Sequence, residues 1–299
     1  MRFPALHRRG LAAALTLASV AFASPALAGV VVTREFKSTA LDRSWKYAVY
    51  LPTGYEASAL RYPALYLLHG NGGNLYQWVN QGRIQQTVDA LIASGDIPPT
   101  VIVMPDAGTS WFVDRKEKME TAVIAELIPD VEKAFRVLRS RDGRLVGGLS
   151  MGAYGAMRFA LKYPEMFAAA ALLSPAIYNP EPPENSSARS VGVFGAPGYD
   201  AAVWKSLNYP SLWEGYLAKK NPVPMYINSG DDDDFFIEFE AVQFYELLRR
   251  NKQPAELRIV NGAHVWPVWE STIGDALKYI YRHAARPAMI ANAGGTAAP

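Results

Sequence analysis

The pentapeptide Gly148-Leu149-Ser150-Met151-Gly152 constrains the fold of this chain more than any other segment. The residues before it, Arg144-Leu145-Val146-Gly147, are typical of a short buried strand. After it, apolar residues from Ala153 to Leu161 recur at the spacing of one helix face. Small residues on both sides allow so sharp a turn. The pattern therefore predicts a strand–turn–helix that presents the Ser150 hydroxyl at a helix N-terminus, where developing negative charge is stabilised.

A nucleophilic serine needs a base, and the chain has four histidines. His7 lies in a predicted leader, His283 lies near the end of a predicted surface helix, and His69 precedes a glycine-rich loop. His264 follows a predicted strand at 257–260 and precedes the final helix. Because ligand-facing residues of an open parallel sheet follow the carboxyl ends of its strands, His264 is the candidate base.

The base needs an acid that orients it, and an acidic run supplies candidates. Residues 225–228 are typical of a strand, and four aspartates, Asp231 to Asp234, follow it closely. Such a run is also typical of a solvated loop or a cation site. One aspartate between serine and histidine completes the chain order of the α/β-hydrolase triad. Asp233 is preferred, Asp234 is the main alternative, and Asp231 or Asp232 remains open.

Backbone N–H groups that stabilise an oxyanion are expected at two places. Met151 follows the nucleophile, so its N–H is the first candidate. A glycine-rich loop after the predicted strand 64–68 allows close backbone approach, and the N–H of Asn71 in this loop is the second. The chain therefore carries all four elements of acyl-transfer chemistry.

Strands and helices alternate along residues 29–283, which predicts one domain with a mostly parallel central sheet and helices on both faces. The expected strands are 30–36, 45–51, 64–68, 101–104, 144–149, 168–173, 225–228 and 257–260, and the expected helices are 84–94, 121–135, 152–163, 237–251 and 268–283. Residues 284–299 are rich in small side chains and are expected to form a disordered tail.

Between residues 174 and 224 the periodicity stops, and seven prolines and many aromatic residues take its place. An aperiodic connection of this length is expected to be a lid or binding element, although its aromatic residues could equally pack together. Trp78 and Trp266 lie on other loops expected at the same end of the sheet. Trp266, two residues past His264, is the stronger candidate for contact with substrate, and Trp78 is the second.

Several motifs in order carry a family resemblance over nearly all of residues 30–283. They are Tyr47-Ala48-Val49-Tyr50-Leu51-Pro52, Leu67-Leu68-His69-Gly70-Asn71-Gly72-Gly73 with Trp78, Val103-Met104-Pro105-Asp106, Glu126-Leu127-Ile128-Pro129, Gly148-Leu149-Ser150-Met151-Gly152, Gly230 to Phe236, and Gly262 to Trp269. The chain resembles the esterase D-like family of α/β-hydrolases. That family includes feruloyl and acetylxylan esterases, S-formylglutathione hydrolases, siderophore esterases and the antigen-85 mycolyltransferases.

The resemblance implies an α/β-hydrolase fold with a lid-like insertion, and it assigns the acid to Asp233 and the second oxyanion N–H to Asn71. It also implies a serine carboxylic ester hydrolase that works through an acyl-enzyme without cofactor or metal. The expected substrate is a small-molecule or carbohydrate-linked ester, such as a feruloyl, acetyl or other short acyl ester. An acyltransferase that uses a sugar acceptor and a non-catalytic binding protein remain alternatives, and a calcium-dependent adhesin is a further one.

Residues 1–28 have the pattern of a cleaved signal peptide. Basic residues end at Arg9, an apolar run spans residues 11–23, and Ala26-Leu27-Ala28 supplies the small residues of a cleavage site. We therefore expect a periplasmic or secreted protein with no integral membrane segment after cleavage. The paired arginines leave the export route open.

Composition agrees with this interpretation. The full chain has a net charge of +2, but its three arginines before residue 29 would be lost, leaving 27 basic against 28 acidic residues. A net charge of −1 without basic runs does not favour nucleic-acid binding. The chain has no cysteine, which excludes a thiol nucleophile and thiolate metal ligands.

Overall fold

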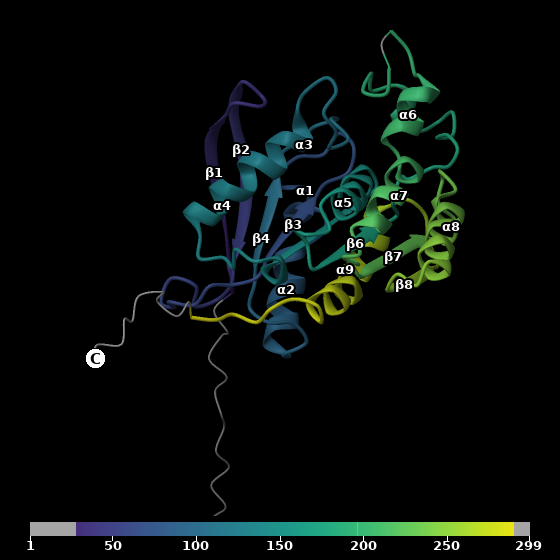
Figure 1. Ribbon diagram of the computed structural model, residues 1–299. Helices are drawn as coiled ribbons and strands as arrows, with labels where there is room; N and C mark the ends of the chain where they lie inside the picture. Colours follow the sequence, from purple (N-terminus) through teal and green to yellow (C-terminus); the bar gives the residue numbers. More distant parts are fainter. Residues whose placement is uncertain (1–27, 196, 290–299) are drawn as a thin grey trace, which may run out of the picture.

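The computed structural model describes residues 28–195 and 197–289. Within them, eight strands form one sheet: β1 (Val30–Ser38), β2 (Arg43–Leu51), β3 (Ala64–Leu68), β4 (Val101–Pro105), β5 (Arg144–Leu149), β6 (Ala169–Leu173), β7 (Met225–Gly230) and β8 (Ala255–Val260). Their order is β1-β2-β4-β3-β5-β6-β7-β8 (Figure 1). The pairs β1–β2 and β2–β4 are antiparallel, and the other pairs are parallel.

The central strands are short apolar runs because both of their faces are covered. Every residue of β3, β4, β5, β6 and β7 is buried. Strands buried on both faces lose the alternation of polar and apolar residues that marks a half-exposed strand. This confirms the predicted α/β architecture with a mostly parallel sheet.

Helices cover both faces of the sheet (Figure 1). On one face, α2 (Ile84–Ala93) and α9 (Trp266–Tyr281) pack against the strands together with the short α1 (Gln77–Asn80). The other face is covered by α3 (Met119–Thr121), a π-helical turn at Ala122–Leu127, α4 (Ile128–Ala134), α5 (Met151–Lys162) and α8 (Ile237–Arg250). The predicted helix 121–135 is thus divided by the π-helical turn.

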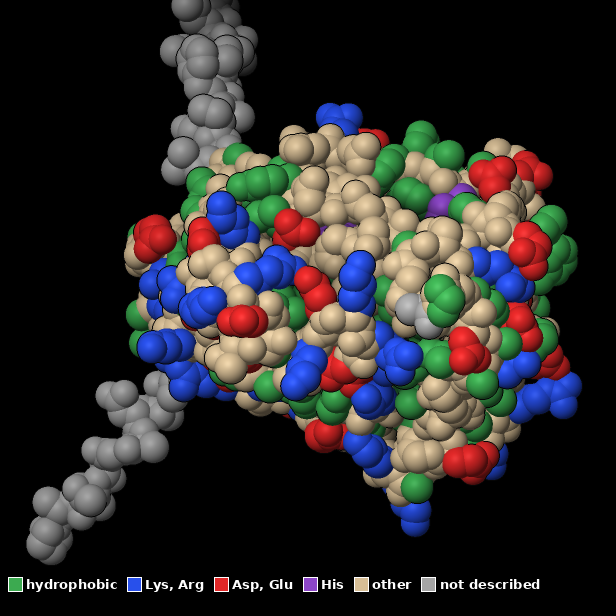
Figure 2. Space-filling view, turned by 90° about the horizontal axis from the view of Figure 1, so that it is seen from above, with side chains coloured by type: hydrophobic (Ala, Val, Ile, Leu, Met, Phe, Trp, Pro, Cys, Tyr) green, Lys and Arg blue, Asp and Glu red, His purple; other side chains and the backbone are tan. Residues whose placement is uncertain are grey.

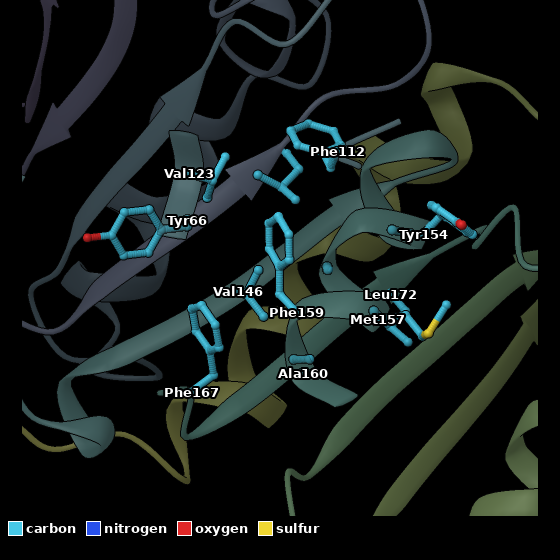
Figure 3. Close-up of a cluster of buried hydrophobic side chains, with 14 of the residues drawn as sticks. Tyr66, Phe112, Val123, Val146, Tyr154, Met157, Phe159, Ala160, Phe167 and Leu172 are labelled. Atoms are coloured by element: carbon cyan, nitrogen blue, oxygen red, sulfur yellow. The ribbon is translucent and has the colours of Figure 1, made fainter. Parts of the chain in front are cut away.

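Helix α5 lies at the centre of the larger core. Eleven of its twelve residues are buried, and its side chains Tyr154, Met157 and Phe159 pack among neighbours from β3, β5 and β6 (Figure 3). Small residues such as Ala153 and Ala156 let the helix approach the sheet closely, as dense packing requires. The helix that follows Ser150 is therefore held rigidly on all sides.

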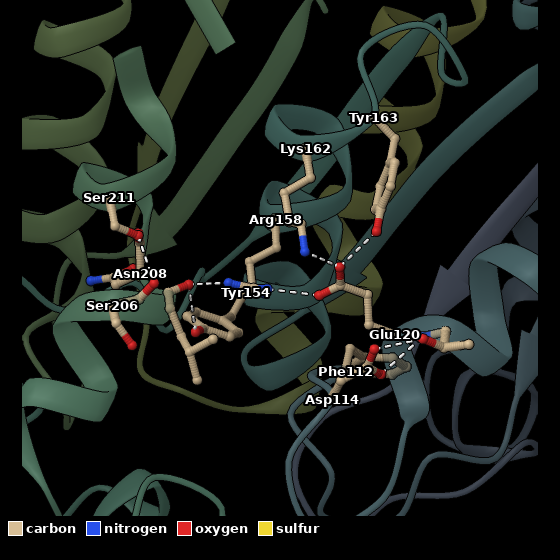
Figure 4. A network of polar contacts seen from close by, with 12 residues as sticks. Phe112, Asp114, Glu120, Tyr154, Arg158, Lys162, Tyr163, Ser206, Asn208 and Ser211 are labelled. Carbon is tan, nitrogen blue, oxygen red and sulfur yellow. Dashed lines mark hydrogen bonds and ion pairs between the residues drawn. The ribbon is translucent and has the colours of Figure 1, made fainter. Parts of the chain in front are cut away.

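A buried network of charges joins α5 to its surroundings (Figure 4). Glu120 of α3 lies 2.7 Å from Arg158 and also contacts Lys162, and the Tyr163 hydroxyl donates to it at 2.8 Å. Arg158 also donates to the carbonyl of Leu207. The network thus connects three segments that are far apart in sequence.

The structure corrects two expectations about the irregular segments. The insertion 174–224 is not structureless, since it contains α6 (Ala201–Leu207) and α7 (Tyr209–Ala218). The start of the expected tail is also ordered: Ala285 N–H donates to the Asp142 carbonyl at 2.8 Å, and Ala288 exchanges two backbone hydrogen bonds with Arg61. The prediction is therefore wrong for residues 285–288. Residues 290–299 lie outside the described residues.

Candidate active site

Ser150 occupies the sharp turn between β5 and α5 that the sequence predicts. Its φ of 53° and ψ of −119° are strained for a residue with a side chain, which is the backbone geometry of a nucleophile elbow. A Cβ on Gly152 would lie 2.4 Å from the Leu68 carbonyl oxygen, so only glycine allows this approach of α5 to β3. The Ser150 N–H donates to the Leu173 carbonyl at 2.9 Å, which fixes the turn against β6.

The structure brings Ser150, His264 and Asp233 together in one hydrogen-bonded chain. His264 Nε2 lies 2.9 Å from Ser150 Oγ, and His264 Nδ1 lies 2.7 Å from Asp233 Oδ2. The Asp233 side chain is fully buried and accepts a further hydrogen bond from the Phe235 N–H at 3.0 Å. Because a carboxylate faces Nδ1, the proton of a neutral ring is held there and Nε2 is left free to accept the serine proton.

Aromatic rings fix the plane of the His264 imidazole. Phe235 and Trp269 each meet the ring edge to face, with centroids 4.9 Å away. Trp269 is itself anchored, because its indole N–H donates to Ser174 Oγ at 3.0 Å. The imidazole is therefore clamped between two rings from different elements.

The other aspartates of the acidic run lie elsewhere. Asp232 and Asp234 are exposed, and Asp234 uses its backbone carbonyl to accept a hydrogen bond from Asn185. Asp231 accepts the Gly262 N–H at 2.9 Å, and Asp232 N–H donates to the Gly262 carbonyl at 2.9 Å. The start of the run thus holds the loop that carries His264, a role that sequence patterns do not single out.

Of the two expected oxyanion donors, Asn71 lines the cavity that Ser150 also lines, and Met151 directly follows Ser150. Met151 is the first residue of α5, so its N–H has no acceptor within the helix. Asn71 follows β3, which pairs with β5 in the sheet. Among the described residues, no acceptor is found for the Asn71 N–H. Both groups are available to a negatively charged oxygen near Ser150.

Two side chains fix Gly70, the residue that precedes Asn71. The Ala107 N–H donates to His69 Nε2 at 2.8 Å, so the ring carries its proton on Nδ1 and donates it to the Gly70 carbonyl at 2.7 Å. Burial lowers the pKa of His69, which keeps the ring neutral. On the other side, Gly70 N–H donates to Gln77 Oε1 at 3.2 Å. Nothing in the sequence except proximity to the loop points to Gln77.

A cavity of about 640 Å³ opens onto Ser150 and has two kinds of wall. Phe235, Val265, Trp266 and Trp269 form an aromatic and apolar wall. The facing polar groups are Asn71, Gln77, Asn185, Ser187 and Ser190, the last three from the insertion. Figure 2 looks down on the carboxyl ends of the parallel strands and shows histidine atoms there beside hydrophobic and acidic side chains.

Of the two tryptophans that are predicted to contact substrate, one lines the cavity and the other lies behind it. Trp266 lines the cavity, whereas Trp78 is 1% exposed, does not line it and donates its indole N–H to the Leu68 carbonyl at 3.0 Å. The two rings meet edge to face at 5.4 Å. Trp78 therefore supports Trp266 from below, and the expectation of a substrate contact for Trp78 is wrong.

The aromatic residues of the insertion mostly pack together. Phe194 and Trp204 meet at 4.8 Å, and both pack with Trp111 from the loop after β4. Tyr178, Tyr209, Trp213 and Tyr216 are also buried. Packing, which the sequence left open, is thus the role of these rings, and the insertion reaches the cavity through residues 185–190.

No group of three or more His, Asp or Glu side chains that could hold a metal ion is found among the described residues. In the same part of the chain, no helix has both the length and the apolar character needed to cross a membrane. The predicted signal peptide, apart from Ala28, lies outside the described residues.

Comparisons with known proteins agree with this geometry. The family model described as Putative esterase matches residues 38–280. An endo-1,4-beta-xylanase/feruloyl esterase of Xylanibacter ruminicola is 39% identical over 143 residues, which are 44% of this chain and 20% of that protein. An esterase of Mycobacterium tuberculosis is 30% identical over 263 residues, which are 77% of this chain and 55% of that protein. The chain thus spans about a fifth and about half of these two curated relatives.

A solved ferulic acid esterase is similar along almost its whole length. Its sequence is 29% identical, and the two structures superpose with a TM-score of 0.73. The superposition covers 85% of this chain and 98% of the ferulic acid esterase. The family match extends from the end of β1 to the end of α9 and includes every residue of the Ser150 site. This chain therefore belongs to the Putative esterase family of α/β-hydrolases.

Proposed function

We propose that this protein is an exported serine esterase that hydrolyses carboxylic esters through an acyl-enzyme on Ser150. The observation that carries the proposal is the chain of hydrogen bonds from Ser150 through His264 to the buried Asp233. It combines a strained nucleophile that lines the cavity, a base within reach and a carboxylate that orients the base. Membership of an esterase family supports the same chemistry.

The reaction has two halves. His264 Nε2 accepts the proton of Ser150 Oγ while that oxygen attacks the ester carbonyl, and the N–H groups of Met151 and Asn71 bind the oxyanion. When the tetrahedral intermediate collapses, His264 gives the proton to the leaving alkoxide, and the acyl group stays on Ser150. Water then attacks the acyl-enzyme with His264 again as base, which releases the acid and restores the serine.

The two walls of the cavity support a substrate with an apolar and a hydroxylated part. Trp266 and Phe235 offer flat surfaces for an aromatic or short aliphatic acyl group. Asn185, Ser187 and Ser190 offer hydrogen-bonding groups to a sugar. Feruloyl or acetyl esters of carbohydrates fit this division, and the names of the relatives point the same way.

Export rests on the N-terminal sequence. The basic residues up to Arg9, the apolar run and Ala26-Leu27-Ala28 together support cleavage after Ala28 and a periplasmic or secreted location. Mass spectrometry of the exported protein would test this, with Gly29 as the expected first residue.

A Ser150→Ala variant tests the catalytic proposal. We expect the purified variant to keep the wild-type melting temperature and to lose hydrolysis of p-nitrophenyl acetate, methyl ferulate and acetylated xylan. A fluorophosphonate probe should label the wild type and leave the variant unlabelled. Residual labelling of the variant would refute Ser150 as nucleophile. A dominant acyl-sugar product in the presence of excess glucose or trehalose would replace hydrolysis by acyl transfer.

A further inference from the structure

Gly29, the residue after the predicted cleavage point, lies in a well-defined site. Its N–H donates to Asp89 Oδ1 of α2 at 3.0 Å, and its carbonyl accepts a hydrogen bond from Gln85 Nε2 at 2.7 Å. Gly29 is buried, whereas Ala28 is exposed. Among the described residues, the first buried one therefore directly follows the Ala-Leu-Ala cleavage motif.

The site accepts glycine and no larger residue. A Cβ on Gly29 would lie 2.4 Å from Tyr50 Cε2 and 2.7 Å from the Leu51 carbonyl oxygen, both in β2. Tyr50 is fully buried and cannot move aside without disturbing the core. Packing against Tyr50 and Leu51 therefore excludes any residue with a side chain at position 29.

Asp89 already has one firm partner. The Tyr50 hydroxyl donates to Asp89 Oδ1 at 2.6 Å, and burial together with this hydrogen bond raises the pKa of Tyr50, so the phenol remains a donor. Tyr281 of α9 is a further titratable group that interacts with Tyr50. Tyr50 and Gln85 bring no positive charge to the half-buried carboxylate, and an ammonium group beside it would supply one.

We propose that Asp89 is the binding site for the α-ammonium group of Gly29, which forms when a signal peptidase hydrolyses the Ala28–Gly29 bond. The reaction adds water across the amide, leaving a carboxylate on Ala28 and an amine on Gly29 that takes up a proton at neutral pH. The amide hydrogen bond of the precursor becomes an ion pair in the processed chain. This inference rests on the proposed export.

The ion pair ties an edge of the sheet to a covering helix. β1 is the edge strand, and Gly29 directly precedes it, while Asp89 and Gln85 belong to α2. Removal of the leader therefore stabilises the fold, and a chain that retains its leader lacks this contribution.

Two purified chains test the proposal without any need for export. One begins at Gly29, released from a fusion by a protease that leaves no extra residue. The control begins at Leu27, so that the Gly29 amide and its hydrogen bond remain while the charged amine moves two residues up the chain. At pH 7 we expect the first chain to melt about 2–4 °C higher, the shift that roughly 1 kcal/mol produces in a domain of this size.

The difference should depend on pH and on Asp89. An amine whose pKa is raised by folding stabilises the protein below its unfolded pKa of about 7.7–8.0, and the contribution is lost as pH rises through the folded value. The two chains should therefore converge at high pH. They should also converge in the Asp89→Asn background, where the carboxylate charge is absent and any change in the Tyr50 hydrogen bond affects both chains equally.

Equal melting temperatures at pH 7, or a difference that persists in Asp89→Asn, would overturn the proposal. Titration of ¹⁵N-labelled Gly29 gives an independent reading in the wild-type chain, with an amine pKa above about 8.0 expected and a lower one contradictory. Cleavage of the exported chain at another residue would refute the proposed processing instead, which keeps the two failures distinguishable.

Discussion

Asp233 and Glu120 are equally buried, at 3% exposed each, yet they belong to regions of opposite character. Asp233 faces the imidazole of His264, whose other nitrogen reaches Ser150 at the wall of a cavity. Glu120 faces Arg158, which is 2% exposed, and Lys162 below α5. The partner, rather than the burial, distinguishes the carboxylate that we propose to orient a base from the one that holds helices together.

The contrast has a simple electrostatic basis. Burial on its own raises the pKa of Glu120, but the charge of Arg158 and the hydrogen bonds from Lys162 and Tyr163 outweigh it and lower the pKa. Permanent cations thus keep Glu120 ionised and fixed. Histidine can be neutral or charged near neutral pH, so the same carboxylate chemistry beside His264 supports proton transfer.

Glu240 of α8 shows what happens without either partner. It accepts a hydrogen bond from the Asn179 N–H at 3.0 Å and has no ion pair among the described residues. Burial raises its pKa to about 7. Glu120 and Glu240 therefore show opposite shifts of the pKa of a buried carboxyl group, with and without permanent cations beside it.

The largest expected effect is on kcat, and it comes from a substitution of Asp233. Asp233→Asn should lower kcat by about 10⁴-fold, because an amide no longer holds the His264 proton on Nδ1 or stabilises the imidazolium. Thermal unfolding should change far less than the rate. Asp234→Asn is the matched control and should retain nearly full activity, and the reverse pattern in steady-state kinetics would move the acid to Asp234.

The second largest expected effect is a loss of stability, and it comes from a substitution of Glu120. Glu120→Gln leaves Arg158 buried without a counter-charge, which should cost about 3–5 kcal/mol of unfolding free energy and lower Tm by roughly 10 °C. The kcat of the remaining folded enzyme should stay within about threefold of wild type at 25 °C. If the rate collapses while Tm is unchanged, the division between the two regions fails.

A neutral side chain sharpens the comparison within the active site. Gln77→Ala removes the acceptor of the Gly70 N–H, so the peptide next to the one that carries the Asn71 N–H becomes freer to move. We expect kcat to fall by about 10-fold, less than the loss of a direct oxyanion donor, with KM nearly constant. If stopped-flow measurements give the same acylation rate constant for Gln77→Ala and the wild type, His69 alone is sufficient to hold this loop.

The smallest effect concerns Glu240 and pH. A carboxyl group with a raised folded pKa stabilises the protein below its unfolded value of about 4.3, and this contribution is lost as pH rises through about 7. Between pH 5 and 7 the wild type should therefore lose stability relative to Glu240→Gln. Parallel unfolding curves of the two proteins over this range would contradict it.

Much of the fold follows from local patterns. The apolar runs of β3 to β7 and the glycines around Ser150 predict strands and a sharp turn, because these signals lie within a few residues of one another. Helices α6 and α7 were missed since prolines and aromatic residues interrupt their periodicity. Tertiary packing around Trp204, which sequence does not display, stabilises them.

The residues of the candidate site likewise fall into those that the sequence predicts and those that it does not. Ser150 and His264 stand out because few residues of their kind occur at strand ends. The roles of Gln77 and Asp231 depend on distances across loops, to Gly70 and Gly262, that no periodicity encodes. Trp78 was misplaced because a tryptophan in a loop gives no indication of whether its ring faces solvent or core.

The packing of the insertion has an evolutionary consequence. Its rings pack around Trp204 together with Trp111 and with Tyr154 of α5, whereas the Ser150, Asp233 and His264 loops are anchored by the sheet. Asn185 donates to the Asp234 carbonyl next to Asp233, whereas Ser187 and Ser190 line the cavity and can change without moving the reacting atoms. Mutations there can retune which esters are accepted while the chemistry persists, so this short loop is a natural starting point for directed evolution of substrate range.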